Sequence, residues 1–190
     1  MNYIEQVRRY NPKTAKDEAI KTAMLRFTEK NQDDVLMRLN SIAHFTASSV
    51  IINEDASKML MIHHKIYDTW TWQGGHADGE ENLLKVALKE AFEETGLRNL
   101  RVLKEADEPI MRLDILPVIE HMKNGEFISN HLHLNAAFVF LASEKGLLNL
   151  NTNETNDIRW VTKQDIDSHA NEAEITPIYH ELIARAESLL

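Results

Sequence analysis

Apolar residues recur at helical spacing in the N-terminal part of the chain. One series covers residues 3–10 and a second covers residues 19–27, with Pro12 between them. Side chains three and four positions apart share one face of an α-helix, so both series predict amphipathic helices. We therefore expect residues 1–40 to form a helical extension.

After residue 44 the spacing changes to short apolar runs bounded by turn residues. Such runs predict β-strands, and Asn53–Ser57 and Asn124-Gly125 have the composition of turns between them. The predicted strands cover residues 45–52, 58–64, 110–120, 131–142 and 157–161. Several of them should pair as antiparallel hairpins.

Two helices interleave with these strands. A glycine-rich loop at residues 73–79 precedes a predicted helix over residues 80–95, and Gly96 is the type of residue that ends a helix. Thr176-Pro177 fits the N-cap and first position of a closing helix that runs to Leu190. The alternation predicts an α/β fold over residues 41–190, with a mixed β-sheet sandwiched between helices.

Composition narrows the range of functions. The 190 residues suffice for one such domain with an appended segment. The absence of cysteine excludes disulfides, thiolate catalysis and cysteine-ligated zinc. A net charge of −9 argues against a nucleic-acid polymer as partner, because that partner needs a basic surface. With no signal-peptide pattern and no apolar run long enough to span a bilayer, we expect a cytoplasmic protein without a membrane partner.

Three glutamates near the end of the predicted helix are the first candidates for chemistry. Glu90, Glu93 and Glu94 are spaced i, i+3 and i+4, so their carboxylates share one helix face. Like charges at this spacing repel, and the negative end of the helix dipole adds to the penalty. A bound Mg²⁺ or Mn²⁺ would remove both penalties, because hard cations prefer carboxylate oxygen. The alternative is a solvated acidic face on an exposed helix end.

The residues around these glutamates favour the metal site. Gly75, Glu81 and the segment Lys89–Leu97 closely resemble the Nudix box, G-x5-E-x7-R-E-U-x-E-E-x-G-U, in which U is a bulky or aliphatic residue. Every fixed position matches except Lys89, which stands where the family has arginine. Ala91 is a small residue for the first U position.

The resemblance implies a Nudix hydrolase with that family's α/β/α sandwich, to which residues 1–40 do not belong. In this family Glu90, Glu93 and Glu94 would hold the catalytic Mg²⁺ or Mn²⁺, with help from the Gly75 carbonyl. Water would then attack a phosphorus of a nucleoside diphosphate linked to another moiety. The implied partner is a small-molecule diphosphate, whose charge the metal neutralises while it activates the water.

The resemblance also suggests the remaining catalytic roles. In some Nudix enzymes the general base is a glutamate of the box, here Glu90, and in others it comes from a downstream loop, here Glu154 or Asp157. We favour Glu90 and retain Glu154 as the alternative. Lys89 would brace the box through a helical ion pair with Glu93, in place of the family's arginine.

Four residues outside the acidic face are candidates for binding the substrate. His131 and His133 alternate along a strand that borders the expected cleft, so both project from one face. His76 directly follows two glycines and is placed to face the diphosphate, and Trp72 could stack on a base. Each residue also has an alternative interpretation. His131 and His133 would be ordinary polar positions on a strand face, His76 would face solvent from its loop, and Trp72 would pack in the core.

Two other functions compete with hydrolysis. Isopentenyl-diphosphate isomerases share the fold but use a catalytic cysteine, which this chain lacks. The second is a ligand-sensing Nudix domain with little turnover; such domains usually lose glutamates of the box, and all four are present here. The sequence leaves open which diphosphate is cleaved and whether residues 1–40 form a homodimer interface.

Overall fold

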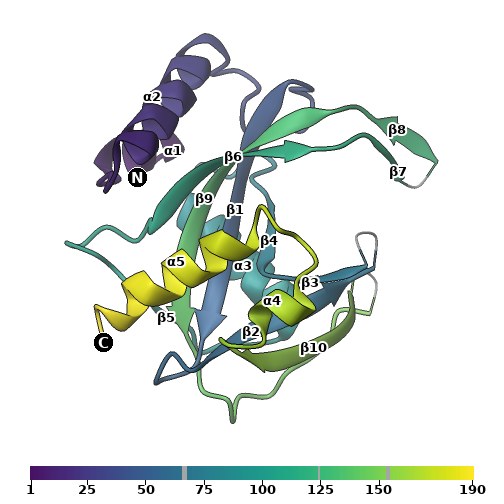
Figure 1. The fold of residues 1–190 in the computed structure, drawn as a ribbon. Helices are drawn as coiled ribbons and strands as arrows, with labels where there is room; N and C mark the ends of the chain where they lie inside the picture. The colour runs from purple at the N-terminus through teal and green to yellow at the C-terminus, as the bar shows by residue number, and fades with distance from the viewer. Residues whose placement is uncertain (66–67, 124, 153–154) are drawn as a thin grey trace.

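The computed structural model describes residues 1–65, 68–123, 125–152 and 155–190 (Figure 1). The helices are α1 (Tyr3–Arg9), α2 (Ala15–Lys30), α3 (Leu83–Thr95), α4 (Ile166–His169) and α5 (Thr176–Glu187). The strands are β1 (Ala43–Ile52), β2 (Lys58–His64), β3 (Thr69–Thr71), β4 (Gln73–His76), β5 (Arg101–Val102), β6 (Arg112–Val118), β7 (His121–Lys123), β8 (Glu126–Ile128), β9 (His131–Leu141) and β10 (Thr155–Thr162). No helix within these described ranges is long and apolar enough to cross a membrane.

The main sheet is mixed, which confirms the predicted α/β architecture. Its central order is β10-β2-β1-β9-β5, and β3, β4 and β6 pair with β2, β1 and β9 respectively. β1 and β9 run parallel over the full length of β1, whereas the other pairs are antiparallel. β4 lies beside the middle of β1, and β2 lies beside its C-terminal end.

Helices cover both faces of this sheet, with α5 in front and α3 behind in the view of Figure 1. Side chains alternate along β1 and β9, so each strand contributes to two cores. Phe45 and Phe138 pack in the core with α3, and Val50 and Val139 pack in the core with α5. The result is a helix–sheet–helix sandwich.

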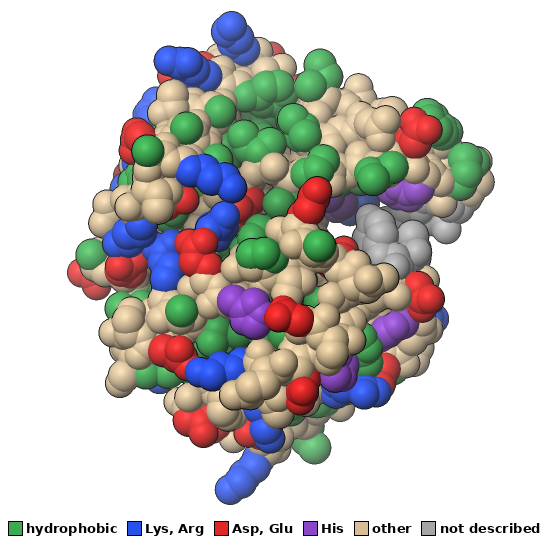
Figure 2. Space-filling model, viewed as in Figure 1, with side chains coloured by type: hydrophobic (Ala, Val, Ile, Leu, Met, Phe, Trp, Pro, Cys, Tyr) green, Lys and Arg blue, Asp and Glu red, His purple; other side chains and the backbone are tan. Residues whose placement is uncertain are grey.

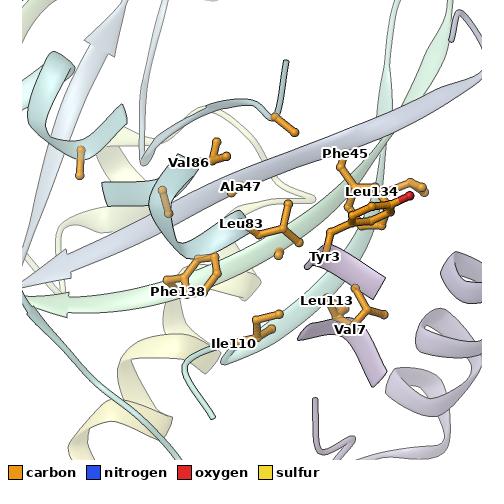
Figure 3. Packing of buried hydrophobic residues seen from close by; sticks show 14 of the residues in the cluster. Tyr3, Val7, Phe45, Ala47, Leu83, Val86, Ile110, Leu113, Leu134 and Phe138 are labelled. Atoms are coloured by element: carbon orange, nitrogen blue, oxygen red, sulfur yellow. The ribbon is translucent and has the colours of Figure 1, made fainter. Parts of the chain in front are cut away.

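The N-terminal helices pack into the same core as α3. The ring of Tyr3 contacts Phe45 edge-on at 5.2 Å between centroids, and Val7 lies close to Leu113 and Ile110 (Figure 3). The side chain of Gln6 is buried, and its Nε2 donates to the carbonyl of Glu81 at 3.1 Å. These helices therefore support the segment that leads into α3.

The predicted glycine-rich loop is partly wrong, because its first four residues form β4. Gln73 to His76 pair with Ser49 to Thr46 of β1, which satisfies backbone groups that a loop would leave to water. The predicted helix also starts later than residue 80. Asn82 is its N-cap, and its side chain accepts from the Lys85 backbone N–H.

Two further expectations about local structure are corrected. A second hairpin, β7–β8, separates β6 from β9, so the strand predicted to run to residue 120 ends at Val118. Of the turn expected there, Asn124 lies outside the described residues, and Gly125 has a positive φ of 84°. Thr176 is not the N-cap of α5: Ile175 takes that position, and the Thr176 hydroxyl donates to the carbonyl of Glu172.

Candidate functional site

The acidic face of α3 is held by well-defined helix ends. Gly96 adopts the left-handed conformation at φ 76°, and its N–H donates to the Phe92 carbonyl. A side chain at this position would also meet Asn149. Leu83, Ala87 and Ala91 pack in the core shared with β1. The last turn of α3, which carries the glutamates, is therefore fixed against the sheet.

Glu94 is the most deeply placed of the three glutamates. The residue is only 5% exposed, and its Oε2 accepts a hydrogen bond from the backbone N–H of Gly74 at 3.0 Å. A buried carboxylate is costly unless it is hydrogen-bonded or paired with a cation. The contact therefore anchors the end of α3 to β4.

Glu90 lies against the next residue of β4. A Cβ atom built on Gly75 would come within 2.6 Å of Oε2 and 2.8 Å of Oε1 of Glu90, so only glycine leaves the space that this carboxylate occupies. The Glu90 side chain is 15% exposed. Both of these carboxylates thus rest on the Gly74–Gly75 backbone, and Gly75 is required there for its lack of a side chain.

Glu93 and Lys89 complete the group on the more exposed side. The Lys89 Nζ lies 3.2 Å from Oε1 of Glu90 and 3.2 Å from Oε2 of Glu93, so the predicted ion pair four residues apart is present. Desolvation acts to lower the Lys89 pKa, but the hydrogen bonds and charges of the two glutamates outweigh it and raise that pKa. One ammonium therefore bridges two of the three carboxylates.

This set of side chains can hold a hard divalent cation. Glu90, Glu93 and Glu94 offer carboxylate oxygen at one end of α3, which is the ligand type that Mg²⁺ and Mn²⁺ prefer. Without a cation, three negative charges face each other, and the Lys89 ammonium offsets only part of that charge. The tight packing of Glu90 on Gly75 and the hydrogen bond of Glu94 preorganise two of the ligands.

A cavity of about 330 Å³ lies beside the same helix. Its lining residues are His76, Ala77, Asp78, Glu80, Lys85, Val86 and Lys89. Asp78 is held by Arg38, which binds its carboxylate with both Nε and a terminal nitrogen, and this contact lowers the Asp78 pKa. Glu81, the first glutamate of the box pattern, is exposed in the segment before α3.

The structure places the three predicted histidines on the other face of the sheet. His76 and His133 have ring centroids 4.8 Å apart, and His131 and His133 have centroids 5.1 Å apart. They join His44 around a second cavity of about 270 Å³. Burial, the main cause, lowers the pKa of His133 to about 2, so this imidazole is neutral at physiological pH.

His44 was missed by the sequence reasoning. It stands next to Phe45 at the start of β1, is buried, and pairs in register with His133 of β9. The sequence feature that could have identified His44 is its position between the apolar residues Ala43 and Phe45, which places it on the other face of the strand. Asn135 is also buried on this face, where its Oδ1 accepts from the hydroxyls of Thr46 and Ser48.

The other predicted site residues lie elsewhere. Trp72 packs against α5, with its ring 5.4 Å from that of Tyr179, so it is not among the residues that line the two cavities. Asp157, on the edge strand β10, is paired with Arg159, which lowers its pKa. Glu154 lies outside the described residues.

Comparisons with known proteins agree with the fold described above. The family model of the NUDIX domain matches residues 43–185. No curated protein matches the sequence significantly. A NUDIX-family hydrolase from Clostridium perfringens superposes with a TM-score of 0.60 at 20% identity, covering 76% of this chain and 98% of the other.

Two further solved structures have the same fold. An Ap4A hydrolase from C. elegans, solved as a binary complex, has a TM-score of 0.57 at 17% identity and covers 76% of this chain and 98% of its own. An E. coli dihydroneopterin triphosphate pyrophosphohydrolase has a TM-score of 0.58 at 13% identity, with coverage of 74% and 95%. At these identities the likeness concerns the fold alone.

Proposed function

The chain belongs to the NUDIX family of hydrolases that act on phosphoanhydride bonds, and we propose that it cleaves the diphosphate linkage of a nucleoside diphosphate joined to another moiety. The observation that carries the proposal is the seating of Glu90 and Glu94 on the Gly74–Gly75 backbone of β4. This packing fixes two carboxylates where a helix end alone would leave them mobile and mutually repelled. We further propose that residues 41–190 form the hydrolase domain and residues 1–40 an extension that packs on it.

Divalent metals are general in this family, and here Glu90, Glu93 and Glu94 with the Gly75 backbone would hold Mg²⁺ or Mn²⁺. When bound, such an ion neutralises charge on the diphosphate and lowers the pKa of water, which supplies the nucleophile. The choice of carboxylate ligands matches these hard ions. The two less exposed members of the set, Glu90 and Glu94, both lie against the backbone of β4.

Other residues of the site would supply the general base, orient the carboxylates and bind phosphate. Glu90 is the proposed general base, because its carboxylate lies against β4, is still 15% exposed and contacts Lys89. Lys89 orients the carboxylates of Glu90 and Glu93 by holding both. Lys85 lines the cavity next to the helix, where a phosphate would accept a hydrogen bond from its ammonium.

The proposal is tested with a substrate panel. The full chain is incubated with Mg²⁺ and oxidised nucleoside triphosphates, ADP-ribose, dinucleotide polyphosphates and nucleotide sugars, and the products are identified. Hydrolysis of a diphosphate linkage is expected for the parent and strongly reduced for Glu94→Gln. The exposed Glu29 of α2 supplies the matched control, because Glu29→Gln removes the same charge far from the box.

Two results would contradict the proposal. If Glu94→Gln and Glu29→Gln turn over equally, the reaction does not depend on the carboxylate site. If a panel member binds in a calorimeter and no product forms at any metal concentration, the chain is a ligand-sensing domain instead.

A further inference from the structure

Three imidazoles converge on the face of the sheet opposite α3. His44 of β1 and His133 of β9 are register partners, and His76 of β4 pairs with Thr46, two residues further along β1. Directly paired residues project from the same face of a sheet, so the three side chains meet. Figure 2 shows histidine side chains in the recess beneath the β7–β8 hairpin.

The distances between these rings match those of a metal centre. Their ligand nitrogens all lie within 4.8 Å of one another. The ring centroids are 5.1 Å apart for His44 and His76, 5.3 Å for His44 and His133, and 4.8 Å for His76 and His133. Three imidazoles bound tetrahedrally to zinc through bonds of about 2.0–2.1 Å place their centroids about 5 Å apart. Small side-chain rotations would thus bring all three nitrogens to one ion.

The hydrogen bonding of His44 leaves a lone pair in the cluster. Its Nδ1 lies 2.9 Å from the carbonyl of Asn40, which can only accept, so Nδ1 carries the proton. The opposite atom, Nε2, is therefore unprotonated; it is buried and has no hydrogen-bond partner among the described residues. A metal-bound histidine commonly donates its other N–H to a carbonyl in this way. An unpaired buried acceptor is costly, and a bound cation would satisfy it.

A fourth imidazole stands beside the three. The Nδ1 of His131 lies 2.8 Å from the carbonyl of Ser129, and its Nε2 lies 3.3 Å from Nε2 of His133. Two nitrogens bound to the same tetrahedral zinc ion are separated by about 3.3 Å. His131 therefore borders the cluster and lines the same cavity of about 270 Å³.

We propose that His44, His76 and His133 bind a Zn²⁺ ion at a site separate from the carboxylates of α3. Neutral imidazole is a ligand that zinc accepts readily, whereas Mg²⁺ selects oxygen. Arg38, the cation that borders this cavity, is engaged by the carboxylate of Asp78, which reduces its repulsion of a bound ion. The zinc site does not depend on the proposed hydrolase activity.

Both sites share β4. Successive residues of a strand point to opposite faces, so Gly75 backs onto Glu90 and the next residue, His76, points to His44 and His133. Three protein ligands leave a fourth position for water or an anionic group. That position opens into a cavity that the hydroxyl-bearing residues Ser41 and Ser129 also line.

Zinc binding to the whole chain provides the test. The protein is purified without a histidine tag, stripped of metal, and titrated with Zn²⁺ in a calorimeter in excess Mg²⁺, which occupies the carboxylates. We expect one tightly bound Zn²⁺ per chain. Substitution by Co²⁺ should give the visible absorption of a tetrahedral nitrogen-ligated ion, a measurement on the unmodified protein that requires no variant.

Variants locate the ion. His133→Gln and His44→Gln should each weaken zinc binding by roughly a hundredfold or more, since even residues that only orient ligands are worth about 10–100-fold. His121→Gln, in the same cavity but outside the cluster, and Glu93→Gln should bind zinc as the parent does. The inference is overturned if the parent binds no Zn²⁺ in excess Mg²⁺, or if Glu93→Gln removes the binding and His133→Gln retains it.

Discussion

Replacement of Gly75 by alanine tests whether the packing of Glu90 on β4 matters for catalysis. The new Cβ would come within 2.6 Å of Oε2 of Glu90, so the carboxylate would have to retreat by roughly 1 Å to reach ordinary van der Waals separation. The neighbour that moves is the end of a flexible side chain. We therefore expect a stability loss of only about 1 kcal/mol, typical of a side chain forced off its rotamer.

The effect on turnover should be much larger. A misplacement of about 1 Å at a reacting group can reduce the rate by about a hundredfold. Gly75→Ala should accordingly lower kcat by roughly that factor and weaken Mg²⁺ binding, measured by steady-state kinetics and calorimetry. Its melting temperature should fall by only a few degrees.

A second glycine supplies the control. Gly125 has a φ of 84°, and a Cβ added to it would meet no atom of the described residues within 4 Å, so Gly125→Ala strains the backbone without touching a carboxylate. It should cost about as much stability as Gly75→Ala, roughly 1 kcal/mol, and leave kcat unchanged. The reasoning is refuted if Gly75→Ala keeps the parent's kcat and metal affinity, or if both variants lose activity in parallel.

Three further predictions concern the same helix. Mg²⁺ or Mn²⁺ should raise the melting temperature in a thermal-shift titration, and chelation should abolish activity; no response to either ion together with chelator-resistant turnover would exclude a metal on α3. Glu94→Gln and Glu93→Gln should each reduce turnover by roughly a hundredfold or more while the chain still folds, and near-normal kcat in both would place the metal elsewhere. Lys89→Arg should retain or modestly raise activity, and Lys89→Ala should lower kcat more than stability; parent-like kinetics and melting in Lys89→Ala would contradict bracing.

The parts of the fold that follow from local pattern were predictable from the sequence. The end of α3 was placed by apolar spacing and by Gly96, which adopts the expected left-handed conformation. The strands at residues 45–52, 58–64 and 131–142 were found within a few residues. In these segments the pattern of buried residues and the local backbone preference favour the same secondary structure, so one sequence is enough to predict it.

The parts that depend on pairing between distant segments were not predictable. Gln73 to His76 contain two glycines, which disfavour a strand, yet β1 imposes that conformation on them. The convergence of His44 on His133 depends on the register of a parallel strand pair separated by almost ninety residues. Local spacing does not determine such a register. The sequence predicted only that His131 and His133 project from the same face of their strand.

On the proposed function, the charges around α3 explain why this acidic chain would need a cation to accept a diphosphate. The cavity beside the helix is lined by two lysines, Lys85 and Lys89, and by two carboxylates, Asp78 and Glu80, so these charges nearly cancel. Lys89 is moreover already engaged by the glutamates of the box, which leave their end of α3 strongly negative. A phosphate approaching this surface would be repelled at a separation where screening by salt is incomplete. A divalent ion held by the carboxylates, as proposed, would reverse the sign of the local field in a protein whose net charge is −9.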